Sequence, residues 1–196
     1  MGKELDAQFW NERYRQGLTG WDIGYPSTPI KEYIDQLENK DLRILIPGAG
    51  NAYEAEYLWE NGFTNITVLD ISEMAIESFK SRLPSFPENQ LLHQDFFKHQ
   101  GQYDLVLEQT FFCAIDPALR KEYANKMHEL ISPEGRLAGV LFNVIFEKEG
   151  PPFGGHLDEY KDVFRPHFTI EIMEPCNNSI PPRSGAEAFI KLKKAD

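Results

Sequence analysis

Short apolar segments alternate with helical patterns along most of the chain, and this alternation limits the fold more than any other feature. Strands are expected at residues 42–46, 66–69, 90–93, 103–107 and 136–144. These runs are almost continuously apolar, which is typical of strands buried on both faces of a parallel sheet. Two closing strands, at 169–174 and 186–192, have no helix between them and predict an antiparallel edge hairpin. We therefore expect an α/β fold with a seven-stranded, mostly parallel sheet and helices on both faces.

The chain has 196 residues, a length that fits one domain. We divide this single domain (1–196) into a helical N-terminal segment, residues 1–40, and a sheet-containing core, residues 41–196. The N-terminal segment begins with a short aromatic-rich helix at residues 7–17 and continues through a turn-rich stretch. We expect the chain to act as a monomer.

Composition argues against several classes of partner. The formal net charge of −11 disfavours nucleic acid, because an acidic surface repels a phosphate backbone. No apolar run approaches the roughly 20 residues of a membrane helix, and residues 1–6 lack the apolar core of a signal peptide. Cys113 and Cys176 form no Cys-x-x-Cys pair, which fits a reducing compartment, so we expect the cytoplasm. No histidine motif with metal-ligand spacing is present, so no metal is expected.

A glycine-containing loop follows the first expected strand. Gly48, Ala49 and Gly50 connect this strand to the next helix, at the sheet edge where open α/β folds bind ligands. Asp70 ends the second strand, 20 residues after Gly50, and is followed by Ile71. A carboxylate at that place can accept hydrogen bonds from ribose hydroxyls. A purely structural turn is an equally good interpretation of the loop alone, but the spaced acid favours a nucleoside-type ligand.

The third glycine of the dinucleotide motif is missing, because Tyr53 occupies its place. This weakens the hypothesis of an NAD-dependent oxidoreductase and favours a ligand without phosphates, such as S-adenosylmethionine. No P-loop motif is present. A non-catalytic module that binds S-adenosylmethionine stays open as an alternative to an enzyme.

Two later strand ends carry further candidate residues. Asp95 and Phe96 follow the third strand, where the acid can accept from an adenine amino group and the ring can flank the base. A helix cap beside core aromatics explains this pair equally well. Glu108 follows the fourth strand and begins a polar-then-apolar run that can face a reacting centre. Continuation into a buried loop is an equally good interpretation of that run.

These segments together resemble the thiopurine S-methyltransferase family, particularly its thiol and halide methyltransferase branch. The resemblance covers nearly the whole chain and is carried by residues 9–14, 20–24, 46–50, 110–115 and 150–153. It implies a Rossmann-like class I methyltransferase fold, S-adenosylmethionine as cofactor and S-adenosylhomocysteine as product. It also implies that Trp10 and Trp21 close over the cofactor, that Gly48 and Asp70 contact its methionine and ribose parts, and that Asp95 and Phe96 hold adenine.

The resemblance implies a small, soft methyl acceptor: a thiol, sulfide, thiocyanate or halide. Halide-methylating relatives tend to carry tryptophan at Tyr14 and an Asp-Tyr pair at Glu108-Gln109, so halide is the less expected acceptor. The candidate substrate contacts are Gln109, Phe111, Phe112, Arg120, Tyr123 and Phe153. The sulfonium is already an activated methyl donor, so we expect catalysis by positioning and water exclusion, with no acid–base residue.

Overall fold

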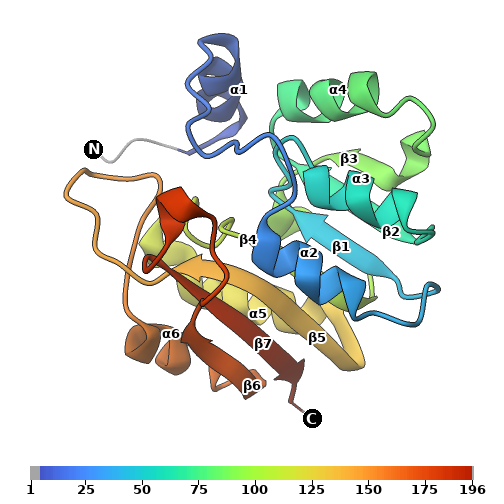
Figure 1. The fold of residues 1–196 in the computed structure, drawn as a ribbon. Helices are drawn as coiled ribbons and strands as arrows, with labels where there is room; N and C mark the ends of the chain where they lie inside the picture. Colours follow the sequence, from blue (N-terminus) through green and yellow to red (C-terminus); the bar gives the residue numbers. More distant parts are fainter. Residues whose placement is uncertain (1–4, 196) are drawn as a thin grey trace.

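A computed structural model describes residues 5–195 and contains one seven-stranded sheet (Figure 1). The strand order is β3-β2-β1-β4-β5-β7-β6. The first five strands are parallel, while β7 lies antiparallel between β5 and β6. The predicted mostly parallel sheet with an antiparallel edge hairpin is therefore confirmed. The strands are β1 (Ile44–Pro47), β2 (Ile66–Asp70), β3 (Leu91–His93), β4 (Tyr103–Gln109), β5 (Ile131–Phe142), β6 (Phe168–Pro175) and β7 (Glu187–Lys194).

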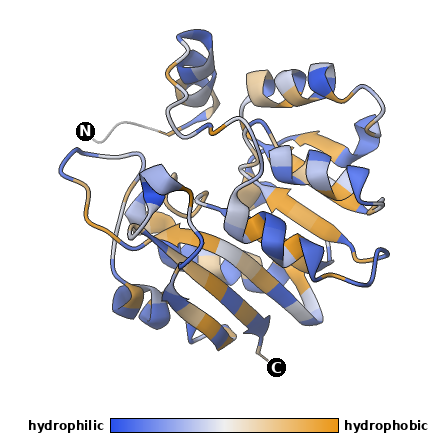
Figure 2. Cartoon of the chain, in the orientation of Figure 1, coloured by the Kyte–Doolittle hydropathy of each residue, from blue (hydrophilic) through white to orange (hydrophobic). Residues whose placement is uncertain are grey.

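Helices cover both faces of this sheet. Buried residues of α2, α3 and α4 form one apolar cluster with one face of the strands, and buried residues of α5 and α6 form a second cluster with the other face. Figure 2 shows these strands as largely hydrophobic between helices whose outer faces are hydrophilic. The α-helices are α1 (Ala7–Arg15), α2 (Thr28–Asp35), α3 (Tyr53–Glu60), α4 (Glu73–Arg82), α5 (Arg120–Leu130) and α6 (Leu157–Phe164). Short 3-10 turns are η1 (Glu88–Gln90), η2 (Phe96–Lys98), η3 (Pro117–Leu119) and η4 (Pro181–Arg183).

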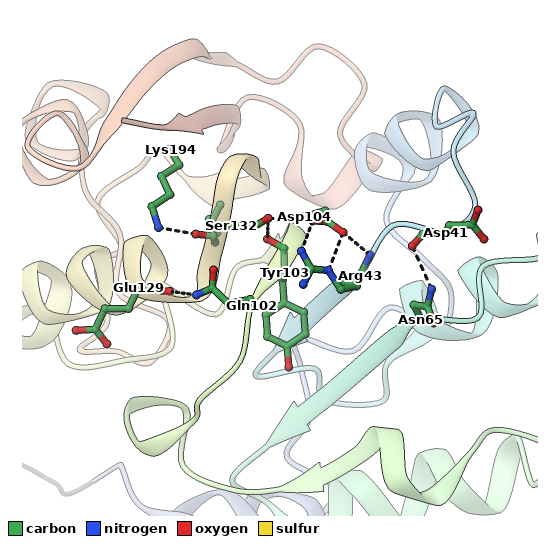
Figure 3. Close-up of polar contacts among 10 residues, drawn as sticks. Asp41, Arg43, Asn65, Gln102, Tyr103, Asp104, Glu129, Ser132 and Lys194 are labelled. Carbon is green, nitrogen blue, oxygen red and sulfur yellow. Dashed lines mark hydrogen bonds and ion pairs between the residues drawn. The ribbon is translucent and has the colours of Figure 1, made fainter. Parts of the chain in front are cut away.

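Polar contacts tie together the strand starts at the amino edge of the sheet (Figure 3). Arg43, just before β1, forms a two-pronged ion pair with Asp104 of β4, with Nη2 to Oδ1 at 2.6 Å and Nε to Oδ2 at 3.0 Å. Ser132 of β5 donates to the same carboxylate at 2.9 Å. Bidentate geometry makes such a pair stronger than an ordinary surface contact. This edge is occupied by structural contacts, which leaves the opposite, carboxyl edge for a ligand.

The start of one strand differs from the predicted one. Residues 132–135, which precede the strand predicted at 136–144, belong to β5, with a register shift where it meets β4. Glu134 takes a left-handed backbone there, so the strand is irregular at this place. Helix α2 begins at Thr28, and Ser27 is its N-cap residue. Among residues 5–195, no helix is both long and apolar enough to cross a bilayer. The segment 1–6, expected to lack a signal peptide, lies partly outside the described residues.

Candidate active site

The glycine loop turns sharply at the carboxyl end of β1. Gly48 and Gly50 both have φ of +55°, a left-handed conformation that residues with a side chain rarely adopt. A Cβ built on Gly48 would overlap the ring of Phe111. A Cβ on Gly50 would lie 3.2 Å from the Tyr14 hydroxyl and 3.8 Å from the Trp21 indole nitrogen. Glycine is therefore required here by the backbone conformation and by aromatic groups close to the loop.

Asp70 links this loop to the end of β2. Its Oδ2 accepts a hydrogen bond from the Gly50 amide at 2.8 Å, and its Oδ1 accepts from the Ser72 amide at 2.7 Å. Burial raises the pKa of Asp70, while these amide donors lower it. The Ile71 amide also lowers the pKa of Asp70 through a hydrogen bond, and a carboxylate has about four acceptor sites, so capacity remains for another donor such as a ribose hydroxyl. Ile71 follows at the strand end and is half-buried.

The N-terminal segment lies against the carboxyl edge, with α1 next to α4 (Figure 1). Asn11 Oδ1 accepts from the Ser72 hydroxyl at 2.7 Å, beside Asp70. The rings of Trp10 and Trp21 meet edge to face with centroids 5.5 Å apart. Tyr14 packs against Trp21 at 5.8 Å. The aromatic residues of this segment therefore form a cover over Gly50 and the end of β2.

Further contacts hold the turn-rich part of the segment to the core. Asp22 accepts a hydrogen bond from the side chain of Asn51 in the glycine loop. Arg183 donates through Nη2 to the Trp21 carbonyl at 2.7 Å. Ser27 donates its hydroxyl to Gln109 Oε1 at 2.6 Å. The segment thus contacts the glycine loop, the end of β4 and the connection before β7.

The loop after β4 supplies the opposite wall. Thr110 has φ of +58°, which is strained for a β-branched residue and is seen mainly at functional sites. Glu108 is fully buried and accepts from the Phe112 amide at 3.1 Å and from the Tyr123 hydroxyl. This carboxylate therefore anchors the turn that brings Phe111 against Gly48.

Burial raises the pKa of Glu108 to about 7, partly offset by the Tyr123 and Phe112 donors. The folded protein therefore binds this proton more tightly than the unfolded chain, whose carboxyl has a pKa near 4.5. We expect the free energy of unfolding to fall as pH rises from about 4.5 to about 7, by on the order of 3 kcal/mol from this group. Denaturant unfolding at pH 5 and pH 8 measures this fall in the free energy of unfolding. In Glu108→Gln this part of the pH dependence should disappear. An unchanged dependence of the free energy of unfolding on pH in the variant would contradict the assignment to Glu108.

Three other predicted site residues, Asp95, Phe96 and Arg120, make contacts with neighbouring segments. Asp95 caps η2 by accepting from the Phe97 amide at 3.0 Å, and Phe96 is buried against Phe111, with centroids 5.3 Å apart. Arg120 donates to the Gly154 carbonyl at 2.9 Å and, more weakly, to that of Phe153 at 3.3 Å. This arginine thereby fixes residues 153–154, in the loop between β5 and α6, to the start of α5.

The structure brings five residues of the predicted set together around the glycine loop, namely Trp21, Gly48, Gly50, Asp70 and Phe111. Phe112 and Tyr123, predicted to contact substrate, are instead fully buried in the core on the α5 side. A substrate would reach these two residues only if the core packing on the α5 side opened. Their role at the site therefore stays a prediction, as does that of every other residue in the set.

Sequence reasoning did not single out Asn11, Asp22, Asn51 and Arg183, which fasten the N-terminal segment. Asn51 directly follows the glycine loop, and a polar residue there was a usable signal. Arg183 lies 162 residues from Trp21, so no local pattern could have linked them. Among residues 5–195, no cluster of three or more His, Cys, Asp or Glu side chains is arranged to hold a metal ion.

The residues of this edge fit S-adenosylmethionine. The left-handed glycines allow close approach of a ligand to the backbone, and Asp70 keeps acceptor capacity for ribose hydroxyls. Phe111 and Trp21 lie next to the two glycines and Trp10 packs against Trp21, and aromatic rings attract a cation such as the sulfonium.

Comparison with known proteins also indicates a methyltransferase. The model of the thiopurine S-methyltransferase (TPMT) family matches residues 5–193. The chain is 29% identical over 193 residues to "Probable thiol methyltransferase 2" of Arabidopsis thaliana, covering 95% of this chain and 84% of that protein. It is also 29% identical over 191 residues to "Thiocyanate methyltransferase 1" of Brassica oleracea, covering 94% of this chain and 84% of that protein.

Solved structures show the same fold. The chain is similar to 1,6-didemethyltoxoflavin-N1-methyltransferase of Burkholderia thailandensis, crystallised with 1,6-didemethyltoxoflavin and S-adenosylhomocysteine. The TM-score is 0.77 with 18% sequence identity, covering 97% of this chain and 87% of that chain. At this identity the similarity concerns the fold, and the predicted Rossmann-like methyltransferase architecture is confirmed.

Proposed function

The chain belongs to the thiopurine S-methyltransferase family, and from this premise we propose that it transfers the methyl group of S-adenosylmethionine to a small sulfur nucleophile. The observation that carries the proposal is the enclosure of the glycine loop by aromatic residues on two sides, Tyr14 and Trp21 against Gly50 and Phe111 against Gly48. A loop enclosed in this way suits a cationic methyl donor and a reaction that water would impede.

Bound S-adenosylmethionine supplies an activated methyl group for an in-line displacement. The protein's contribution is then to bind, orient and exclude water, for which effective molarities are worth several kcal/mol. Asp70 and the glycine loop would hold the nucleoside and methionine parts. Phe111, fixed through Glu108, would form the apolar wall beside the reacting methyl group.

The acceptor assignment rests on the relatives named for thiol and thiocyanate methylation and on the apolar wall at Phe111. We expect turnover with sulfide or an aromatic thiol to exceed that with chloride, because chloride is strongly hydrated and an apolar wall offers it no replacement for water. Gln109→Tyr should raise iodide turnover relative to thiol turnover. Product formation measured for sulfide, thiocyanate, iodide, chloride and an aromatic thiol tests both points. Chloride outpacing every sulfur acceptor would contradict this acceptor class.

The N-terminal segment is proposed to act as a lid that the cofactor orders. Leu18 and Tyr25 are exposed beside the glycines of its turn-rich part, which makes them accessible to chymotrypsin. We expect S-adenosylhomocysteine to slow chymotryptic cleavage at residues 17–25 at least several-fold, because lids close over bound ligand. A parallel digest with trypsin, followed at exposed Lys148 in the loop after β5, is the control and should not change. Equal cleavage at residues 17–25 with and without ligand would favour a purely structural segment.

Three further proposals concern the cellular compartment, the class of substrate and the oligomeric state. Cys113 and Cys176 are both free and buried, which is compatible with a reducing compartment, and we propose the cytoplasm. The net charge of −11 supports a small-molecule substrate rather than nucleic acid. We propose a monomer, which size-exclusion chromatography with light scattering would test.

A further inference from the structure

Asn51 directly follows Gly50 of the glycine loop, and its side chain makes hydrogen bonds to two other segments. Its Nδ2 donates to Asp22 Oδ2 in the N-terminal segment, and its Oδ1 accepts from the Ser78 hydroxyl of α4 at 2.8 Å. The bond to Asp22 is partly buried, where water competes less for such contacts. Asn51 therefore joins the proposed cofactor loop to the lid and to the helical layer.

The backbone of Asn51 is held in place as well. Arg82 of α4 donates through Nη2 to the Asn51 carbonyl, and its Nε forms an ion pair with Glu56 of α3 at 2.6 Å. The next residue, Ala52, has φ of +52°, a left-handed conformation that is unfavourable for a residue with a side chain. The arginine thus stabilises the turn after Gly50 and fixes the position of the Asn51 amide.

The partner of Asn51 in the lid is also positioned by its own contacts. Asp22 Oδ1 accepts from the Gly24 amide at 2.8 Å, so this carboxylate uses one oxygen within the lid and the other for Asn51. Asp22 directly follows Trp21, whose indole nitrogen lies close to Gly50. Hydrogen bonds to a charged acceptor are roughly twice as strong as neutral ones. The bond between Asn51 and Asp22 is therefore suited to holding the lid against the loop.

Two other polar contacts of the N-terminal segment end outside the glycine loop. Asn11 accepts from Ser72, the residue that caps α4, and Arg183 of η4 donates to the Trp21 carbonyl. These contacts fasten the segment to the core. Asn51 differs from them because its position depends on the loop that would hold the cofactor.

We propose that the hydrogen bond between Asn51 and Asp22 is a latch that keeps the lid closed over bound cofactor and sets how long the cofactor stays bound. Asn51 is thus a positioning residue that touches no reacting atom. The inference rests on the proposed function, because it requires S-adenosylmethionine to bind at the glycine loop. Cofactor against this loop keeps the Asn51 amide within reach of Asp22, and the closed lid blocks the exit of the cofactor. Release of S-adenosylhomocysteine after methyl transfer then requires the latch to open.

The test exchanges the two side chains, because aspartate and asparagine have nearly the same shape. In Asn51→Asp two carboxylates face each other and repel, and in Asp22→Asn an amide replaces the charged acceptor. In the double variant Asp22→Asn/Asn51→Asp the donor and the acceptor change places. The acceptors for the Gly24 amide and the Ser78 hydroxyl are then retained, and so is the net charge.

Stopped-flow tryptophan fluorescence with S-adenosylhomocysteine measures association and dissociation separately. We expect dissociation to be on the order of 10-fold faster in Asn51→Asp and about threefold faster in Asp22→Asn, with association changed less than about twofold. The double variant should return to within about twofold of the unmodified protein. The protection of residues 17–25 from chymotrypsin by S-adenosylhomocysteine should be lost in Asn51→Asp and should return in the double variant.

Asn61→Asp is the matched control, because it makes the same change from amide to carboxylate at the end of α3. The side chain of Asn61 is exposed, and its Nδ2 donates to the Tyr57 carbonyl at 2.8 Å, within the same helix end. The control should release S-adenosylhomocysteine at the rate of the unmodified protein. Denaturant unfolding establishes which variants are folded.

Unchanged dissociation in a folded Asn51→Asp, equally fast dissociation in Asn61→Asp, or a folded double variant that releases S-adenosylhomocysteine as fast as Asn51→Asp would each overturn the latch. If the double variant does not fold, the two single variants decide by the same comparison with Asn61→Asp. These outcomes leave methyl transfer intact. An unmodified protein that does not bind S-adenosylhomocysteine would instead overturn the proposed function, and this inference with it.

Discussion

Gly48→Val is expected to abolish cofactor binding, with an affinity loss of roughly 100-fold or more for S-adenosylhomocysteine. Two features of the structure cause this. The backbone at Gly48 has φ of +55°, which valine adopts only under strain, and its Cβ would overlap the Phe111 ring. Either the loop or Phe111 must move, and both belong to the proposed cofactor site. Isothermal titration calorimetry with S-adenosylhomocysteine measures the effect.

Gly62→Val is the matched control. Gly62, after α3, also has a left-handed backbone, with φ of +86°, but a Cβ there meets nothing within 4 Å. The control therefore shares the backbone strain without the overlap at the loop. We expect it to lower the free energy of unfolding while binding S-adenosylhomocysteine within about threefold of the unmodified protein. Normal binding by a folded Gly48→Val would show that the loop is only a connector.

Asp70→Ala is the second variant with a large expected effect. Loss of hydrogen bonds to a charged acceptor is worth about 1.5–3 kcal/mol, which corresponds to a 10- to 150-fold weaker S-adenosylmethionine complex. The variant also removes the acceptor for the Gly50 and Ser72 amides, so the free energy of unfolding should fall as well. Binding calorimetry and denaturant unfolding, performed on the same preparation, separate the two effects.

Asp70→Asn serves as the comparison, because an amide oxygen can still accept from one of the two backbone amides. We expect it to recover part of the stability and little of the affinity, since its nitrogen cannot accept from a ribose hydroxyl. If Asp70→Ala folds and binds S-adenosylmethionine with unchanged affinity, Asp70 has a structural role only.

Features that depend on neighbouring residues could be predicted from the sequence. The continuous apolar runs predicted the buried strands, and the strand–glycine–helix pattern predicted the loop at Gly48 and Gly50. The spacing to Asp70 predicted that the acid would lie beside this loop, and it accepts from the Gly50 amide. In each case a short range of chain determines the geometry.

Features that depend on distant residues could not be predicted in the same way. Glu108 begins an ambiguous polar-then-apolar run, and only the packing of α5 shows that it binds Tyr123 in the interior. The contact of Arg183 with Trp21 joins two ends of the chain. The bond from Asn51 joins the glycine loop to a turn 29 residues earlier. Tertiary contacts of this kind leave no periodic signal in the sequence.

The central claim, methyl transfer to a small sulfur nucleophile, is tested most directly by following the methyl group itself. The protein is incubated at pH 7 with S-adenosylmethionine labelled in the methyl group and with a small thiol, and both products are quantified by mass spectrometry. We predict one labelled methyl thioether for each S-adenosylhomocysteine formed, and no thioether with Gly48→Val. A protein that binds S-adenosylmethionine but forms S-adenosylhomocysteine with no thiol, sulfide or thiocyanate would contradict the account and would instead be a non-catalytic binding module.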